Sequence, residues 1–546
     1  IDVSGDLTLI LGLDSTLDTL TVGSIQITNT GTVTASQNVT SNGDIVFDGT
    51  GNLTLGGDFR TTNSGANISL PNSILLLTGD RLMSTTNGDI FLDEVQTDTA
   101  DDHVLTLLAG IGNITIDDNF GVDGTEPAGL TITSATDVTF STANATLETN
   151  GLIITNAAGQ VRLDGTANID GSVDINTATF DLNAAMNVDG NGTFTLTNSG
   201  TADLGADITV DGNTLFDGDG GLTLGADISL RNNSASFTVN NSTLTLTEDR
   251  SISTTNGDMT FDEILTDTDN DHVLTLTAGT GSIVVDDNFG VNGGNVPAGF
   301  TIESGGDVHF SGAAATVDVD QLLIGNISAI GADVEFDAAV NVGGEVDINT
   351  STLTLDAALT TTGSGNVTVT NSGTATLNAA ISSDGDALFD GAGGITMSDN
   401  ITLTGNGATF TINDSVITLT GNRFITTTNG DITLDEVVAN AADSRSFTLT
   451  AGTADVTVDD NIGSNGTELS ALTIESAGNV LFSSSSASID ANALTIGNTS
   501  DTSGNVTFQG ALRIDGNTDI NSDAQISVSS TGSITASGTG TIDLSA

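Results

Sequence analysis

Carboxylate side chains gather in short polar turns, where they could bind a hard cation. Asp267, Asp269 and Asp271 occupy alternate positions of one turn, a spacing that lets a loop place several oxygens around Ca²⁺. An Asp-Asp-Asn trio occurs three times, at 117–119, 286–288 and 459–461. The glycine and distal glutamate of an EF-hand loop are missing. The sequence predicts weak calcium binding, with a merely solvated acidic turn as the alternative. The candidate ligands are Asp117, Asp118, Asp286, Asp287, Asp459, Asp460, Asp267, Asp269 and Asp271.

The three histidines are the next candidates, because imidazole titrates near neutral pH and binds metals. His103 and His272 occupy one repeat position, at which a third copy has Arg445. His309 lies in a strand-like run whose sister copies have Thr and Leu at the same place. A position that tolerates such different side chains is expected to face outward. No two histidines lie at ligand spacing, so a zinc site is not predicted.

One enzymatic alternative fits these residue types, a calcium-dependent polysaccharide lyase in which a basic residue accepts a proton beside calcium. Such a site would be single and irregular, whereas this chain consists of near copies joined by short turns. Trp and Tyr, which commonly stack on sugars, are absent. The recurring Arg81, Arg250 and Arg423 are expected to neutralise nearby carboxylates instead. We therefore expect no enzymatic activity.

The charge of the chain limits its partners. Its 546 residues contain 71 Asp and Glu against eight Lys and Arg, a formal net charge of −63. Such a surface repels phosphate backbones and anionic lipid, so we expect no nucleic-acid partner. The longest aliphatic run, 74–77, is too short to span a bilayer, so membrane insertion is not expected. Ile1 is not an initiator methionine, which favours a processed, secreted chain or a piece of a longer one.

Three copies of one long unit make up the chain. The motif Phe47-Asp48-Gly49 returns at 216–218 and 389–391, with offsets of 216 − 47 = 169 and 389 − 216 = 173 residues. The stretch 84–89 returns in the same way at 253–258 and 426–431. The repeats are assigned to residues 1–172, 173–345 and 346–517, with 518–546 as the start of a further repeat.

Short strands are predicted throughout each repeat. Runs such as 53–55, 237–239 and 353–355 alternate apolar residues with Thr, the period of a half-buried strand. Asn-Gly, Asp-Gly and Gly-Gly pairs between the runs supply the positive φ angles of tight turns. A helical period of 3.6 is not found. The chain is therefore predicted to be all-β.

Strand length and side-chain size select among the all-β folds. Tandem sandwiches would need units of about 100 residues with hairpins and a large two-sided core. Very short strands, small side chains and few aromatics favour an elongated parallel β-solenoid of the right-handed β-helix type, with about 20–25 residues per coil assumed. The strand pattern continues close to both ends, at 7–10 and 534–536, without a visible cap. End-to-end stacking or a longer native chain is expected, and either gives a fibre.

The strand at 430–434 (Gly-Asp-Ile-Thr-Leu), the Asn-Gly turns, the abundance of Thr, Asp and Gly, and the lack of Cys and Lys together form a pattern that covers the whole chain. It resembles the repeat regions of filamentous-haemagglutinin-like adhesins and other giant bacterial β-solenoid surface proteins. The resemblance supplies no functional residues. It implies an exported fibre, at the cell surface or outside the cell, used for attachment, aggregation or a sheath.

These observations predict an extracellular structural or adhesive segment, a stiff acidic rod. Its expected partners are copies of itself, joined end to end or laterally with Ca²⁺ between acidic faces, and other cells or a surface. The alternative is a passive stalk of a larger adhesin whose binding domain lies outside this chain.

Overall fold

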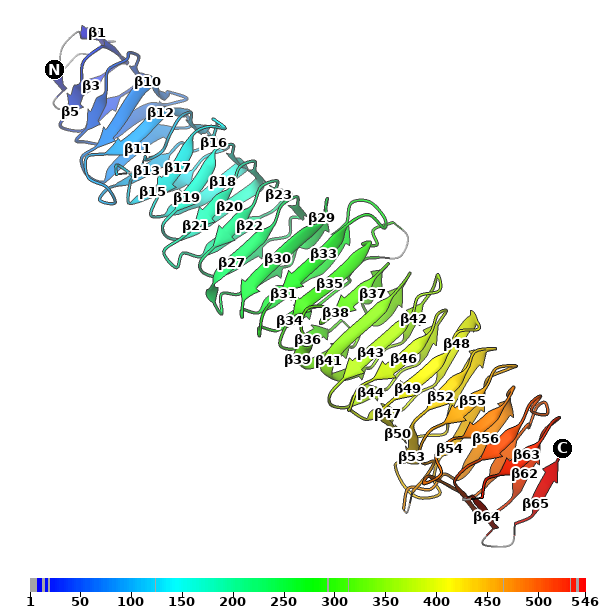
Figure 1. Cartoon of the computed structure of the whole chain (residues 1–546). Helices are drawn as coiled ribbons and strands as arrows, with labels where there is room; N and C mark the ends of the chain where they lie inside the picture. The colour runs from blue at the N-terminus through cyan, green and yellow to red at the C-terminus, as the bar shows by residue number, and fades with distance from the viewer. Residues whose placement is uncertain are drawn as a thin grey trace. The chain divides into compact units, whose positions relative to one another are not determined.

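A computed structural model describes residues 7–11, 15–17, 20–122, 124–291, 294–312, 314–464, 466–530, 532–536 and 540–546. The described residues form strands and turns without a helix, and every described strand pair is parallel (Figure 1). The predicted all-β, parallel β-solenoid fold is therefore confirmed. The chain divides into two compact units, residues 1–264 and 265–546, which are considered separately below.

Three strands make one coil of the first unit, and each strand pairs with the corresponding strand of the next coil. One such set is β4 (Ile25–Asn29) with β7 (Ile45–Phe47), β5 (Val33–Ala35) with β8 (Leu53–Leu55), and β6 (Val39–Ser41) with β9 (Phe59–Ser64). The pairing of Ile27 with Phe47 gives a coil of 47 − 27 = 20 residues. Three parallel ladders, here called faces, therefore surround the core of the unit.

Alternation along each strand places apolar side chains inside the coil. In β8, Leu53 and Leu55 are fully buried and Thr54 between them is half-buried. Phenylalanine rings of successive coils contact one another in tilted or edge-on geometry, in the row formed by Phe180, Phe194, Phe216, Phe237 and Phe261, with neighbouring ring centroids 5.4–6.4 Å apart. Burial of such a row is the main stabilising contribution in a narrow core.

Stacked turns explain part of the glycine content. An ideal Cβ on Gly220 would lie 1.9 Å from the carbonyl oxygen of Gly200 in the coil below, so no larger residue fits there. The buried Asn198 beneath it donates its side-chain N–H to that same carbonyl. Asn29 makes the equivalent bond to Gly31 at 2.7 Å in the first repeat. Each Phe-Asp-Gly motif thus marks a turn that packs directly on the turn of the coil below it.

The sequence repeat is not a whole number of coils. One ladder of the first unit runs from β4 through β7, β10 (Ile68–Leu77), β12 (Ile90–Thr97), β14 (Ile114–Ile116), β16 (Val138–Phe140), β18 (Leu152–Leu163) and β20 (Val173–Leu182) to β23 (Ala202–Leu204). The equivalent of β4 in the second repeat is β22 (Phe194–Asn198), since 194 − 25 = 169. β22 does not continue the ladder of β4. It pairs with the first half of β20 and so belongs to the ladder that contains β6.

The second unit shows the same shift of one face per repeat. Its first ladder runs from β33 (Val273–Thr277) through β35 (Gly299–Ser304), β38 (Leu322–Ile324) and β41 (Val346–Leu355) to β43 (Val367–Asn371). The equivalent of β33 in the third repeat is β54 (Ser446–Thr450), which pairs with β51 (Arg423–Thr428) and β56 (Ala471–Ser476) on another face. Equivalent residues of successive repeats therefore point in different directions around the solenoid.

The predicted repeat boundaries coincide with strand starts, at Val173 of β20, Val346 of β41 and Thr518 of β62 (Thr518–Asn521). Residues 1–6 of the first repeat lie outside the described residues. Within the described part of the chain, no helix of the length and apolarity needed to cross a membrane is present.

Candidate functional site

Asp and Asn side chains at the corners of the coils hold neighbouring coils together. Asp44 Oδ1 accepts a hydrogen bond from the backbone N–H of Asn67 at 2.8 Å, and Asn67 Oδ1 accepts one from Asp89 at 2.7 Å. Asp89 Oδ1 in turn accepts from the N–H of Asn113 at 2.8 Å. Asp and Asn alternate in this row because either side chain offers the one oxygen that the bond requires.

The second unit contains the same kind of corner row. Asp431, Asp455 and Asn479 accept from the backbone N–H groups of the next coil, at 2.9, 2.6 and 2.8 Å. Each bond pairs a backbone donor at the edge of a turn that the strand ladder does not reach. Much of the acidity of the chain therefore belongs to its architecture.

This corner role predicts unequal effects of two substitutions at Asp89. Asp89→Ala removes the acceptor and should lower the local free energy of unfolding by about 1 kcal/mol. Asp89→Asn keeps the acceptor and should change it by less than about 0.5 kcal/mol. Hydrogen exchange of the Asn113 amide measures both, and equal exchange rates in the two variants would show that the bond is unimportant.

The first and third residues of each Asp-Asp-Asn trio also join neighbouring coils. Asp286 Oδ1 accepts from the hydroxyl of Ser311 at 2.6 Å, and Asn288 Oδ1 accepts from the N–H of Thr316 at 3.0 Å. The other copies make the same contacts, Ser141 with Asp117, Thr146 with Asn119, Ser483 with Asp459 and Ser488 with Asn461. The recurrence of the trio is thus explained by these structural contacts.

The two aspartates of a trio also form a strip of negative charge with carboxylates of the preceding coil. Burial raises the pKa of Asp93 in β12, and repulsion from Asp118, Asp117 and Glu94 raises it further. The pKa of Asp435 is raised in the same way, by burial and then by Asp460, Asp414 and Asp459. Such strips are where a cation would most relieve repulsion.

The turn with alternate aspartates directs its carboxylates to separate partners. Asp267 Oδ1 lies 2.9 Å from His272 Nε2, and Asp269 Oδ1 accepts from the N–H of Val296 at 3.0 Å. Asp271 is exposed. These three side chains therefore do not converge on one point, and calcium binding here, as at the trios, stays a prediction.

The prediction that the histidine of this turn faces outward is wrong, because the side chain is largely covered and pairs with an aspartate. His272 is only 13% exposed, and the equivalent His103 contacts Asp98 at 2.9 Å. In the third copy, Arg445 Nε donates to Asn440 at 2.9 Å. The two paired positions, five residues apart, hold Asp and His in the first two copies and Asn and Arg in the third. This joint change is the sequence signal that could have revealed the pairing.

The recurring arginines cap backbone carbonyl groups. Arg81 Nε donates to the carbonyl of Leu55 at 2.9 Å, and Arg81 Nη1 donates to that of Asp80 at 2.7 Å. Arg423 Nη1 donates to the carbonyl of Asn422 at 3.2 Å, while Arg250 also contacts the Glu248 carboxylate. The expected pairing with a nearby carboxylate is therefore seen at Arg250, whereas the contacts described here for Arg81 and Arg423 are to carbonyl groups.

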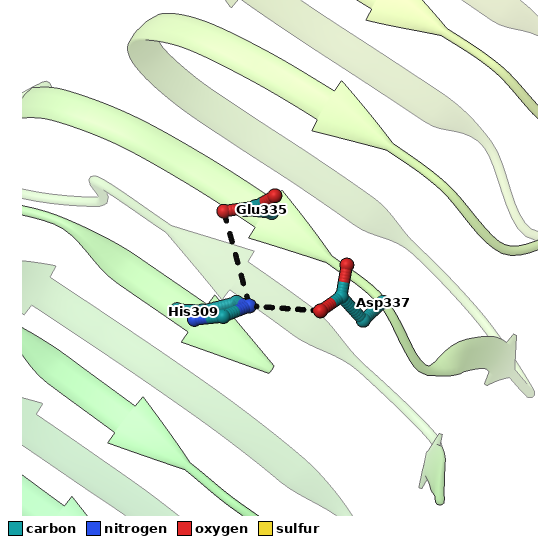
Figure 2. Close-up of side chains that lie close together, drawn as sticks. All are labelled: His309, Glu335 and Asp337. Atoms are coloured by element: carbon teal, nitrogen blue, oxygen red, sulfur yellow. Dashed lines mark hydrogen bonds and ion pairs between the residues drawn. The ribbon is translucent and has the colours of Figure 1, made fainter. Parts of the chain in front are cut away.

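One group of metal-ligating side chains converges in the second unit. Figure 2 shows His309 directed toward Glu335 and Asp337, which lie on the next coil. His309 Nε2 is 3.2 Å from Asp337 Oδ2 and 3.8 Å from Glu335 Oε2. Within the described residues this is the one group of three or more His, Cys, Asp or Glu whose ligand atoms lie so close together. His309 faces outward, as expected, with 33% of its side chain exposed.

The fold and these corner contacts define a parallel β-solenoid protein with an acidic surface. Comparisons with protein-family models, curated proteins and solved structures gave no match. A function must therefore be inferred from the arrangement of the coils and their side chains.

Proposed function

We propose that the chain is a structural segment of an extracellular fibre, of the kind that filamentous-haemagglutinin-like adhesins contain. The observation that carries the proposal is the shift of one face per repeat in each unit. Equivalent side chains are distributed around the solenoid and are not concentrated on one binding face. Such an arrangement suits a stalk or filament, in which every coil adds about 4.8 Å of length and its own share of stability.

The acidic surface supports a place outside the cell. The strip formed by Asp93, Glu94, Asp117 and Asp118 suffers repulsion that a divalent cation would relieve. Extracellular calcium modules bind with dissociation constants of about 10⁻⁴–10⁻³ M, an affinity that rigid, exposed carboxylates can provide. We infer that calcium bridges acidic faces of neighbouring copies laterally.

In the proposed fibre, copies also join end to end, because the open strand edges of a solenoid coil pair readily with a further coil.

Sedimentation velocity of the purified chain tests this assembly. The wild type is expected to form species larger than one chain in millimolar calcium, whereas the double variant Glu94→Gln, Asp118→Asn, which removes two charges beside Asp93, should form fewer of them. Asp219→Asn, which removes a charge at an exposed turn, serves as the control and should assemble like the wild type. A wild type that is monomeric with calcium and with chelator would contradict self-assembly.

A passive stalk is the second candidate, because the exposed apolar side chains of the described residues are scattered. Away from the last coil they are Leu82, Ile111, Ile153, Val291, Ile327 and Phe424. A tight protein interface usually centres on clustered aromatic and arginine side chains, and Trp and Tyr are absent. On this account a binding domain outside the chain supplies adhesion, and the solenoid holds it away from the surface.

A further inference from the structure

We propose that His309, Glu335 and Asp337 form a binding site for a divalent transition-metal ion of the zinc type. His309 is the central residue of β36 (Val308–Phe310), and it pairs directly with Glu335 in β39 (Ile330–Phe336). Asp337 follows β39 at once. The three ligands therefore come from two neighbouring coils of the second unit, and this proposal is independent of the fibre function.

The ligand distances suit a small tetrahedral ion. Bonds of about 2.0–2.2 Å to nitrogen and oxygen place tetrahedral ligand atoms about 3.3–3.5 Å apart. The observed distances from His309 Nε2, 3.2 Å to Asp337 and 3.8 Å to Glu335, lie on either side of this value. The three ligand atoms all lie within 4.8 Å of one another. Small side-chain rotations therefore complete the site, and the fourth position is left to water.

The backbone beneath the site is held by strand pairing and core packing. The N–H of Asp337 donates to the carbonyl of Phe310 at 3.0 Å, which fixes the residue beyond the strand end. The rings of Phe310 and Phe336, which flank the site on the inner side, stack with centroids 4.8 Å apart. Ligands that project from such paired strands keep their spacing without a bound ion.

The second repeat differs from both sister copies at the His309 and Glu335 positions, and from the third repeat at the Asp337 position. The pair equivalent to His309 and Glu335 is Thr139 with Arg162 in the first repeat and Leu481 with Thr507 in the third repeat. The residues that correspond to Asp337 are Asp164 and Gln509. Arg162 contacts Asp164 at 2.7 Å, so in that copy a guanidinium already neutralises the carboxylate. In the second repeat a metal ion would take the place of that positive charge.

The donor set selects the metal. Imidazole nitrogen is a good ligand for zinc, copper, nickel and iron, whereas calcium and magnesium prefer oxygen. Two carboxylates beside one neutral imidazole give the site a charge of −2, in a chain of net charge −63. The class of ion is therefore a borderline divalent transition metal, and zinc is the probe of choice.

Isothermal titration of the chelator-treated full chain with Zn²⁺, in a background of millimolar calcium that competes for exposed carboxylates, tests the site. One zinc ion per chain is expected to bind more tightly than all others. His309→Thr, which introduces the residue of the first copy, should weaken that binding at least tenfold. His103→Arg, which introduces the residue of the third copy, removes an imidazole elsewhere and should leave it unchanged.

Two results would overturn the proposal. Equal zinc affinity in the wild type and in His309→Thr would assign binding to other carboxylates. Absence of a tight zinc site in the wild type would leave the triad as an ion pair only. Glu335→Thr, the residue of the third copy, provides the second variant and should weaken zinc binding even if His309→Thr fails to fold.

Discussion

Replacing Phe237 by alanine is expected to lower the local free energy of unfolding by about 3–5 kcal/mol. The side chain is completely buried in β28 (Phe237–Asn240), with the ring centroids of Phe216 and Phe261 at 5.8 and 5.5 Å. Its removal leaves a cavity between two coils whose backbones are held apart by strand pairing, so the neighbours cannot collapse into it. The matched control is Phe424→Ala, because that ring is 40% exposed.

Hydrogen exchange shows where this stability is lost. In a solenoid each coil contacts only its neighbours, so stability is approximately a sum over adjacent coils. Protection should fall in β28 and in the strands that pair with it, β25 (Thr214–Asp217) and β31 (Met259–Phe261), and persist in β4–β8. A uniform loss across the first unit would contradict the nearest-neighbour account, as would an equally large effect of Phe424→Ala.

Lowering the pH from 7 toward 4 is expected to raise the melting temperature. Burial, reinforced by neighbouring carboxylates, raises the pKa of Asp93 and of Asp435 above the ordinary range. A carboxyl whose pKa is higher in the folded chain stabilises it fully below the unfolded pKa of about 3.9. This contribution is lost as the pH rises through the folded pKa. The pKa of Glu468 is lowered by backbone N–H groups, so it acts in the opposite direction.

Among the described residues, carboxyl groups with a raised pKa outnumber the one with a lowered pKa, so the net effect of acidification is stabilising. Those with a raised pKa are Asp93, Asp181, Asp347, Asp435, Glu436 and Asp490. The double variant Asp93→Asn, Asp435→Asn should flatten the dependence of melting temperature on pH, whereas Asp219→Asn, at an exposed turn, should not. Calcium at pH 7 should raise the melting temperature of the wild type for the same reason. A melting temperature that is flat or falls as the pH is lowered from 7 to about 4 would refute this electrostatic account.

Strands and turns could be predicted because their signals are local. The alternation of Leu53, Thr54 and Leu55 shows which side chains enter the core, and the Phe-Asp-Gly motifs mark turns that stack. The shift of one face per repeat could not be predicted. Strands such as β10 and β20 continue from one face to the next without a glycine turn, so the number of faces in a repeat cannot be counted from turn signals.

The contacts at the coil corners and around His309 could not be predicted from the sequence, for a different reason. The partners of Asp44 and Asp89 are backbone N–H groups one coil away, and a backbone donor has no signature in the sequence. His309 meets Glu335 at a separation of 335 − 309 = 26 residues, whereas Ile27 meets Phe47 after 20. Because coil length varies, the residue that lies above a given side chain depends on the three-dimensional register.

Electron microscopy of the purified chain, with calcium and with chelator, tests most directly whether the solenoid is a fibre subunit. Long, uniform fibres with an axial repeat of one chain in calcium are expected, because calcium then screens the repulsion between the acidic faces of neighbouring copies. Isolated single particles under both conditions would contradict self-assembly and would assign the chain the role of a spacer.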